Sequence, residues 1–439
     1  MDDPVLGSRP APLATATPTP PTSVVHRRRG PIAALAVTAL LLAGCAGRAQ
    51  GPAPASPSGS ALSGSAVVLE PMVSGPREDV PSALDDPADP ALPTPAVDPA
   101  RILAGGPPPD GIPAIDEPRF LPAAGVDWLG ADEAVIALDL DGHQRAYPVQ
   151  ILHWHEIVND TVGGRPVAVT YCPLCNTALA FDRQAAGRVL DFGTSGSLYL
   201  SALVMYDRQT QSLWSQVERS AIAGTLTGTE LELIPVTMLR WADWLAAAPE
   251  GWVLSRETGA QRPYGTNPYV GYDDIDNTDT FLDEAVDTQF AAKLRVVVFP
   301  GAADPVAVLA GDLAALGVAE ILVDGSPVIL FSAPGLASAL DVADVADGAP
   351  VTATGAFRPE VDGRVLTFTT LIGGEPGVGP AAGAAVARDE QTGSDWDLLG
   401  RAVDGPLAGA RLTAVPHVNT FWFAQAAFRP DTEVLRLQP

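Results

Sequence analysis

The feature that most constrains the fold of this chain is an internal similarity. Residues 135–181 align without a gap on residues 296–342, and further matches follow in the same order toward the C-terminus. Among them, the segment 209–214 matches the segment 391–396, and both end in a tryptophan. Because chance does not give so many matches in one order, we expect two tandem copies of one module.

Each copy is predicted to contain the same elements. An alternating pattern over 135–140 predicts a strand, and a proline at position 148 introduces a short helix. The dipeptides Gly163-Gly164 and Asp324-Gly325 favour tight hairpin turns, since both suit positive φ angles. Further strands and a helix around Trp241 complete the module. The sequence therefore predicts an α+β fold in which strands dominate and helices are short.

The rest of the chain gives the expected domain organisation. Residues 1–45 have the features of an export signal, and residues 46–118 are rich in Pro, Ala, Ser and Gly. Such a composition buries little apolar surface, so we expect 46–118 to be a disordered stalk. The first module is expected at 119–270 and the second at 294–439, with an acidic linker at 271–293 between them.

The N-terminal segment predicts a lipid anchor. Three arginines at 27–29 precede a short apolar stretch at 31–42, which is too short to span a bilayer. The following Leu42-Ala43-Gly44-Cys45 resembles the lipobox of bacterial lipoproteins, in which the cysteine is acylated. We therefore expect Cys45 to be lipidated and the protein to lie on the extracytoplasmic face of the cell membrane, where it meets an unknown envelope partner.

The charge and the cysteine content exclude two classes of protein. The 439 residues include 52 acidic and 26 basic side chains, a formal charge of −26, and only Lys293 among the basic ones is a lysine. Nucleic-acid binding needs clustered positive charge, so we expect no nucleic-acid partner. Apart from Cys45 there is one close cysteine pair, which is too few for a disulfide-stapled scaffold.

One group of chemically active residues is predicted in the first module. His153, His155 and Glu156 fall in the expected helix, and Cys172 and Cys175 follow the hairpin strand. The second module has apolar residues at the positions aligned with the two histidines and the two cysteines: Ala314, Leu316, Ala333 and Leu336. Residues that form one site are expected to be lost together, so we interpret the second module as degenerate.

The aligned helix of the second module indicates which histidine faces inward. Leu309, Leu313 and Leu316 recur at helical spacing and predict the buried stripe. Because Leu316 aligns with His155, we expect the imidazole of His155 to point into the core toward the cysteines. His153 lies about 200° around a helix from that direction and is expected to point elsewhere.

Three chemistries fit these residues. Two thiolates and an imidazole suit Zn or Cu, with Glu156 or His153 completing the ligands of a site formed by His155, Cys172 and Cys175. Alternatively, the two cysteines form a reversible disulfide tuned by His155. The third possibility is a structural disulfide in a non-catalytic binding or scaffold module of the cell envelope. No other catalytic residue is predicted, and whether the protein is an enzyme is left open.

The residues around this site also resemble a known family. The segments 155–160, 171–175, 192–196 and 204–208 are similar to the bacterial domain of unknown function 3179, over nearly everything after about residue 118. The resemblance implies an exported protein with the histidine and the cysteine pair as its signature, and it implies no activity. The family usually has glycine after the second cysteine, where this chain has Asn176.

Overall fold

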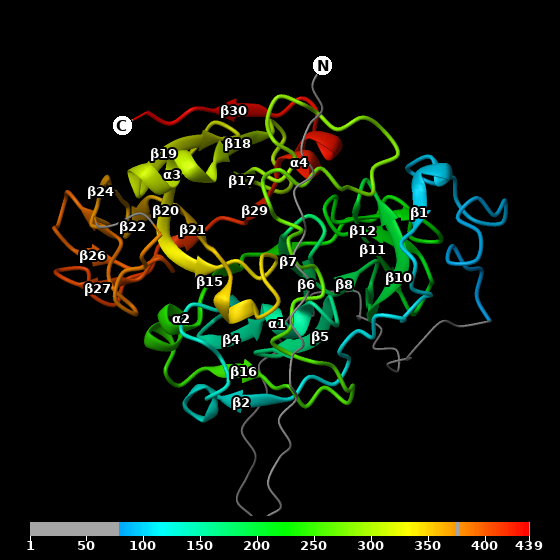
Figure 1. Cartoon of the computed structure of the whole chain (residues 1–439), viewed down its shortest axis with the longest axis horizontal. Coiled ribbons are helices and arrows are strands. Elements are labelled where there is room, and N and C mark those ends of the chain that lie inside the picture. The colour runs from blue at the N-terminus through cyan, green and yellow to red at the C-terminus, as the bar shows by residue number, and fades with distance from the viewer. Residues whose placement is uncertain (1–78, 374–376, 439) are drawn as a thin grey trace, which may run out of the picture. The chain divides into compact units, whose positions relative to one another are not determined.

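The computed structural model describes residues 79–373 and 377–438, which all belong to one compact unit. The predicted signal, its lipidated Cys45 and the first part of the stalk lie outside the described residues. Strands dominate the described part, as predicted, and its α-helices are short (Figure 1). They are α1 (Val149–Leu152), α2 (Trp241–Ala247), α3 (Ala310–Leu316) and α4 (Trp422–Phe428). In this part of the chain no helix has the length and apolar character needed to cross a bilayer.

The first half builds three sheets and a small hairpin. The strand orders are β15-β3-β4-β16-β2, β14-β7-β6-β5 and β1-β10-β11-β12-β13, and the hairpin is β8-β9. The bounds are β1 (Ile102–Ala104), β2 (Phe120–Pro122), β3 (Ala134–Leu140), β4 (His143–Pro148), β5 (Ile157–Val162), β6 (Arg165–Cys172), β7 (Thr177–Asp182), β8 (Gln184–Ala185), β9 (Arg188–Val189), β10 (Phe192–Tyr199), β11 (Ala202–Asp207), β12 (Leu213–Ser215), β13 (Ser220–Ala223), β14 (Leu233–Ile234), β15 (Thr237–Arg240) and β16 (Trp252–Leu254).

The second half builds sheets of corresponding order. They are β29-β17-β18-β30, β28-β21-β20-β19 and β24-β25-β26-β27, with the hairpin β22-β23. The bounds are β17 (Arg295–Val298), β18 (Val306–Leu309), β19 (Val318–Val323), β20 (Ser326–Ala337), β21 (Pro350–Arg358), β22 (Glu360–Val361), β23 (Arg364–Val365), β24 (Phe368–Thr370), β25 (Ala387–Asp389), β26 (Asp395–Trp396), β27 (Ala402–Asp404), β28 (Thr413–Ala414), β29 (Val418–Phe421) and β30 (Glu433–Leu435).

A local motif recurs in both halves. The indole of Trp214 donates to Asp207 at 2.9 Å, and the indole of Trp396 donates to Asp389 at 3.0 Å. In both halves, too, the last strand of one sheet joins it in parallel, β16 to β4 and β30 to β18. These correspondences agree with the sequence pattern, while the tandem duplication itself stays a prediction.

The gapless alignment of the halves does not extend past the hairpin strand. In the first half β6 turns at once into β7, so Cys172 pairs with Thr177. In the second half Ala333 pairs with Ala353, across a much longer connection. Leu336 still lies within β20, whereas the second cysteine lies in a turn, so the two are not equivalent positions.

The folded part of the chain begins inside the segment 46–118, which the sequence predicts to be a disordered stalk. Strand β1 pairs antiparallel with β10, and Ile115 is buried. The guanidinium of Arg208 donates to Asp110 at 3.1 Å and to Asp116 at 2.6 Å. Composition misses this docking because the few apolar side chains that the segment buries are scattered among proline, glycine and aspartate.

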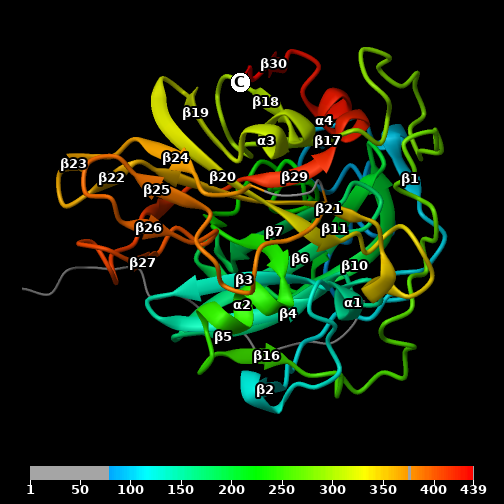
Figure 2. The same ribbon diagram turned by 60° about the vertical axis from the view of Figure 1, so that its left-hand side comes forward.

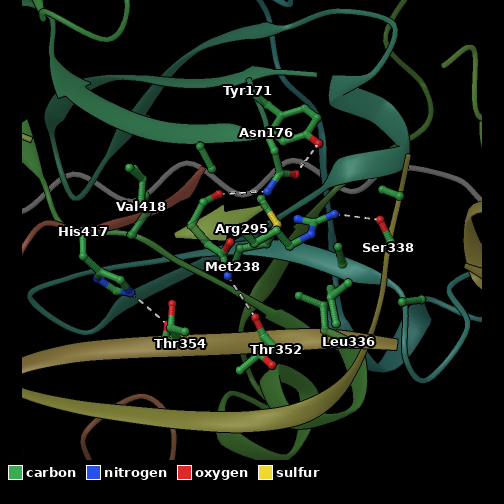
Figure 3. A pocket seen from close by; sticks show the side chains of 17 residues that line it. Tyr171, Asn176, Met238, Arg295, Leu336, Ser338, Thr352, Thr354, His417 and Val418 are labelled. Atoms are coloured by element: carbon green, nitrogen blue, oxygen red, sulfur yellow. Dashed lines mark hydrogen bonds between the residues drawn. The ribbon is translucent and has the colours of Figure 1, made fainter. Parts of the chain in front are cut away.

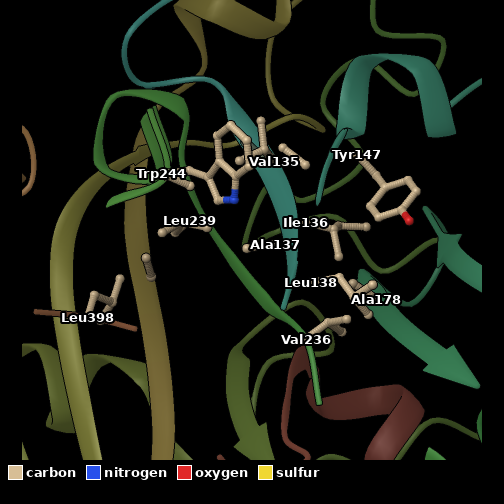
Figure 4. Close-up of a cluster of buried hydrophobic side chains, with 14 of the residues drawn as sticks. Val135, Ile136, Ala137, Leu138, Tyr147, Ala178, Val236, Leu239, Trp244 and Leu398 are labelled. Carbon is tan, nitrogen blue, oxygen red and sulfur yellow. The ribbon is translucent and has the colours of Figure 1, made fainter. Parts of the chain in front are cut away.

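The two predicted modules share their hydrophobic cores. Figure 4 shows one such cluster, in which Leu239 and Trp244 of the first half lie on the side of Leu398 of the second. Strands β20 and β21 of the second half contact β15 of the first half, and Figure 1 shows the three close together. Removing either half would therefore expose apolar surface of the other, which is unfavourable in water.

Candidate functional site

The predicted helix that holds the histidines is shorter than its pattern implied. Helix α1 ends at Leu152, and the backbone continues in turns through Glu156, whose φ is +56°. Helical spacing therefore does not apply to His153 and His155. Both side chains are buried, although the sequence predicted that they point in different directions and that only one faces the core.

His155 is buried as predicted, but its imidazole does not join the cysteines. Its Nδ1 lies 2.6 Å from the carbonyl oxygen of Pro113, and its Nε2 lies 2.6 Å from the hydroxyl of Tyr264. A carbonyl only accepts, so Nδ1 donates and Nε2 accepts from Tyr264. Because both nitrogens are hydrogen bonded, His155 has no lone pair left for a metal or a thiol. Its two hydrogen bonds connect the segment around Pro113 with the segment around Tyr264.

The two cysteines lie together at the end of the hairpin strand. Cys172 is the last residue of β6, and Cys175 stands in the turn that leads to β7. Both are free thiols, with exposed fractions of 2% and 0%. The Cys175 thiol donates to the carbonyl oxygen of Cys172 at 3.9 Å. Burial first, and then Cys175, raise the pKa of Cys172 well above its ordinary value.

The turn between the cysteines is held in place by both halves of the chain. Asn176 adopts a φ of +54°, which asparagine tolerates better than most residues, and it accepts a hydrogen bond from Tyr171. The carbonyl oxygen of Cys175 accepts from the hydroxyl of Thr420 at 2.7 Å. The motif is therefore a turn between strands, and it does not open a helix as it does in thioredoxin-like proteins.

Glu156 is a buried acidic residue whose carboxyl group interacts electrostatically with Cys172. Its backbone is fixed on two sides, because its amide donates to Leu152 and its carbonyl accepts from Tyr171. Burial first, and then the charge interaction with Cys172, raise the pKa of Glu156 to about 8. A carboxyl group with such a pKa exchanges protons with a thiol more readily than an ordinary glutamate does.

His153 packs between aromatic rings. Its ring centre lies 5.6 Å from that of Tyr171 and 6.0 Å from that of Tyr269. Within the described residues neither ring nitrogen has a hydrogen-bond partner. Burial lowers the pKa of His153 to about 3, so the imidazole is neutral near pH 7.

We expect His153→Phe to stabilise the protein by about 1–2 kcal/mol at pH 7, since it removes two unpaired buried polar atoms. The gain should be larger at pH 4. Between pH 6.5 and 3 the unfolded state binds a proton that the folded imidazole does not, so the wild type loses stability as the pH falls. Urea unfolding at both pH values measures the difference. A loss of stability at pH 7 would instead indicate that the imidazole holds a bound ligand.

Residues that the sequence did not single out cover the thiols. Tyr269 interacts electrostatically with Cys172, and Tyr272 with both cysteines. Lys293 is 2% exposed, and burial lowers its pKa to about 7. The one signal in the sequence was that Lys293 is the only lysine of the chain.

The predicted metal ligands are not assembled. Among the described residues, no group of three or more His, Cys, Asp or Glu side chains is placed to hold a metal ion. Of the five predicted residues, the structure brings Cys172 and Cys175 together, and Glu156 interacts electrostatically with Cys172. The structure leaves His155 with Pro113 and Tyr264.

A small cavity lies beside the turn, between strands of the two halves (Figure 3). Its volume is about 30 Å³, which holds water and no larger ligand. Tyr171, Asn176 and Arg295 line it. Asn419 also lines it, and its buried side-chain amide oxygen has no partner in the described residues. This cavity is consistent with ordered water and gives no space for a substrate.

Comparison with known proteins gives one match. A family model described as protein of unknown function (DUF3179) matches residues 109–432. No curated protein and no solved structure matches the chain.

Proposed function

Because the chain belongs to the DUF3179 family, whose description names no activity, we propose from the geometry of the site that the protein is a thiol–disulfide redox protein. Its redox pair is Cys172 and Cys175. The observation that supports this most directly is that two free, buried thiols lie close together at one turn, where the Cys175 thiol donates to the Cys172 carbonyl oxygen and a buried carboxyl group, Glu156, interacts electrostatically with Cys172. A disulfide needs two cysteines whose Cα atoms lie within about 7 Å of each other, and the short turn after β6 keeps Cys172 and Cys175 close in space.

The proposed reaction reduces a disulfide of an exported partner protein. Glu156, as carboxylate, takes the proton of Cys172, and the thiolate attacks one sulfur of the partner disulfide. The first partner sulfur leaves and takes up a proton from Glu156. Cys175 then attacks Cys172 in the mixed disulfide and releases the second partner sulfur, which takes up the proton of Cys175. The partner gains two electrons and two protons, and the protein gains the Cys172–Cys175 disulfide. The reverse sequence oxidises a partner dithiol.

The location that we propose agrees with this chemistry. The predicted lipid anchor at Cys45 would place the site outside the cytoplasm, where disulfides form and persist. The stalk would hold the site at a distance from the membrane, within reach of envelope proteins.

A redox titration tests the proposal. The full chain is equilibrated anaerobically with mixtures of reduced and oxidised glutathione, and the peptide with both cysteines is examined by mass spectrometry for the loss of two hydrogens. We expect a reversible disulfide in the wild type and in Cys45→Ser, which removes the third thiol. We expect none in Cys172→Ala or Cys175→Ala, for which alanine avoids a buried unpaired hydroxyl.

Two outcomes would overturn the redox proposal. If both thiols stay reduced in oxidised glutathione while the protein remains folded, the pair is structural, as in a scaffold module. If the reduced protein holds one equivalent of zinc or copper that either alanine variant loses, the pair is a metal site.

A further inference from the structure

The thiol pair is closed off by a segment of the chain that has no regular structure. Residues 269–293, here called the strap, contain neither helix nor strand and lie between β16 and β17 (Figure 2). The strap includes the whole of the predicted acidic linker, 271–293. Its residues Tyr269, Tyr272, Leu282, Val286 and Phe290 pack on the hydrophobic cluster that contains both cysteines.

The strap packs on the cluster in which both thiols are almost completely buried. Its residues Tyr269, Tyr272 and Lys293 interact electrostatically with the cysteines. A partner disulfide has to approach a sulfur atom directly for exchange to occur. In the arrangement described here the strap therefore has to move before the proposed reaction can start.

Lys293 connects two parts of the strap with each other and with the second half of the chain. Its ammonium lies 3.4 Å from the centre of the Tyr272 ring and donates to the carbonyl oxygen of Asp279 at 2.8 Å. The rings of Phe421 and Phe423, which belong to β29 and α4, lie 5.4 and 4.7 Å from the same nitrogen. One side chain thus joins two points of the strap to the second half, through cation–π contacts and one hydrogen bond.

The start of the strap is held firmly, because Asp273 pairs with Arg295 at 2.7 Å and the preceding two amides donate to the backbone of residues 340–341. Residues 274–290 have fewer hydrogen bonds to the rest of the protein, and their partly exposed ion pair with Arg101 contributes little. The amide of Phe281 donates to the hydroxyl of Ser201 at 3.1 Å, and the indole of Trp422 donates to Asp287 at 2.8 Å. Ile275 and Phe281 are each 49% exposed, so this part of the strap buries little apolar surface. Segments with few buried contacts open locally at a low free energy, well below that of global unfolding.

We propose that the strap is a gate over the thiol pair and that Lys293 is its latch. This inference rests on the proposed function, because a gate matters only for a pair that reacts. It assigns to the second half a role in regulating the site of the first half, since the latch binds to Phe421 and Phe423.

Alkylation of the thiols tests the gate independently of redox chemistry. The reduced, folded full chain is treated with iodoacetamide, and the labelling rates of Cys172 and Cys175 are measured by mass spectrometry. We expect Lys293→Met to raise both rates about tenfold, the size of effect typical for loss of a charged hydrogen bond and its cation–π contacts. Lys293→Arg should retain most of the protection.

Two further variants keep the test decisive. Asp287→Ala removes a strap anchor at an exposed position and should also raise the labelling rates, even if Lys293→Met fails to fold. Arg436→Met removes an exposed cation that pairs with Asp312, far along the chain from the strap, and should leave the rates unchanged. The rates should depend little on low urea concentrations, because local opening exposes less surface than global unfolding.

Unchanged rates in folded Lys293→Met and Asp287→Ala would overturn the gate. That result would leave a reversible disulfide in the glutathione titration intact. Conversely, faster alkylation without any disulfide would support the strap and reject the redox function, so the two failures can be told apart.

Discussion

Glu156→Gln is expected to remove a large loss of stability that the wild type suffers as the pH rises. Burial and Cys172 raise the folded-state pKa of Glu156 to about 8, against 4.5 for the ordinary group. Between these values the folded state binds a proton that the unfolded state does not, so the unfolding free energy falls with increasing pH. The contribution is complete below pH 4.5 and is lost as the pH passes 8. Each unit of pKa difference corresponds to about 1.4 kcal/mol, so we expect the unfolding free energy to fall by several kcal/mol over this pH range.

Urea unfolding of the wild type and the variant at pH 5, 7 and 9 measures this effect. We expect the variant to become progressively more stable than the wild type from pH 5 to 9. The difference between the two proteins isolates Glu156, because His153 and Lys293 titrate in both. Glu257→Gln, at a side chain 77% exposed, is the matched control and should leave the profile unchanged. Parallel profiles for Glu156→Gln would show that the carboxyl group is solvated in the folded state.

Arg208→Met is expected to destabilise the protein by about 3 kcal/mol, because it leaves two partly buried carboxylates without their cation. The Arg208 side chain is 2% exposed and pairs with Asp110 and Asp116. Asp110 also accepts from Tyr206 at 2.5 Å, and Asp116 accepts from Asn159 at 2.8 Å. The substitution should therefore loosen residues 102–118 from the first half and make them sensitive to limited proteolysis.

Arg388→Met provides the control for the buried arginine. Arg388 also binds a carboxylate with two nitrogens, that of Asp395, but its side chain is 51% exposed. Exposed ion pairs contribute about 1 kcal/mol or less, so this variant should unfold at nearly the wild-type urea concentration. Equal effects of the two substitutions would contradict the assignment of residues 102–118 to the folded unit.

The site was only partly predictable because its geometry depends on where a helix ends. The apolar spacing of the second half predicted a helix long enough to carry both histidines, and α3 does extend to Leu316. In the first half α1 stops at Leu152, and the turns that follow bury both His153 and His155. A difference of one helical turn decided which residue approaches the cysteines, and propensity does not fix element ends to that precision.

The pairing of distant residues was outside the reach of the sequence. Nothing near the cysteines in the chain indicates that Tyr269, Tyr272 and Lys293 interact with them, since Tyr269 lies at the end of the predicted first module and the other two lie in the predicted acidic linker. Likewise, the sequence could not show where the stalk ends, because Asp110 and Asp116 pair with Arg208, which lies more than ninety residues away in the chain.

The amino-acid sequence by itself determined the strand-dominated class, the hairpin turns, the family and the adjacency of the two cysteines. All of these follow from local periodicity, turn chemistry and motif spacing. Only the tertiary structure decided that His155 is bound to Pro113 and Tyr264, that Glu156 is buried and interacts with Cys172, and that the strap packs on the cluster that contains the thiols. These depend on burial and long-range packing, which set the desolvation of each charge and which no local pattern encodes.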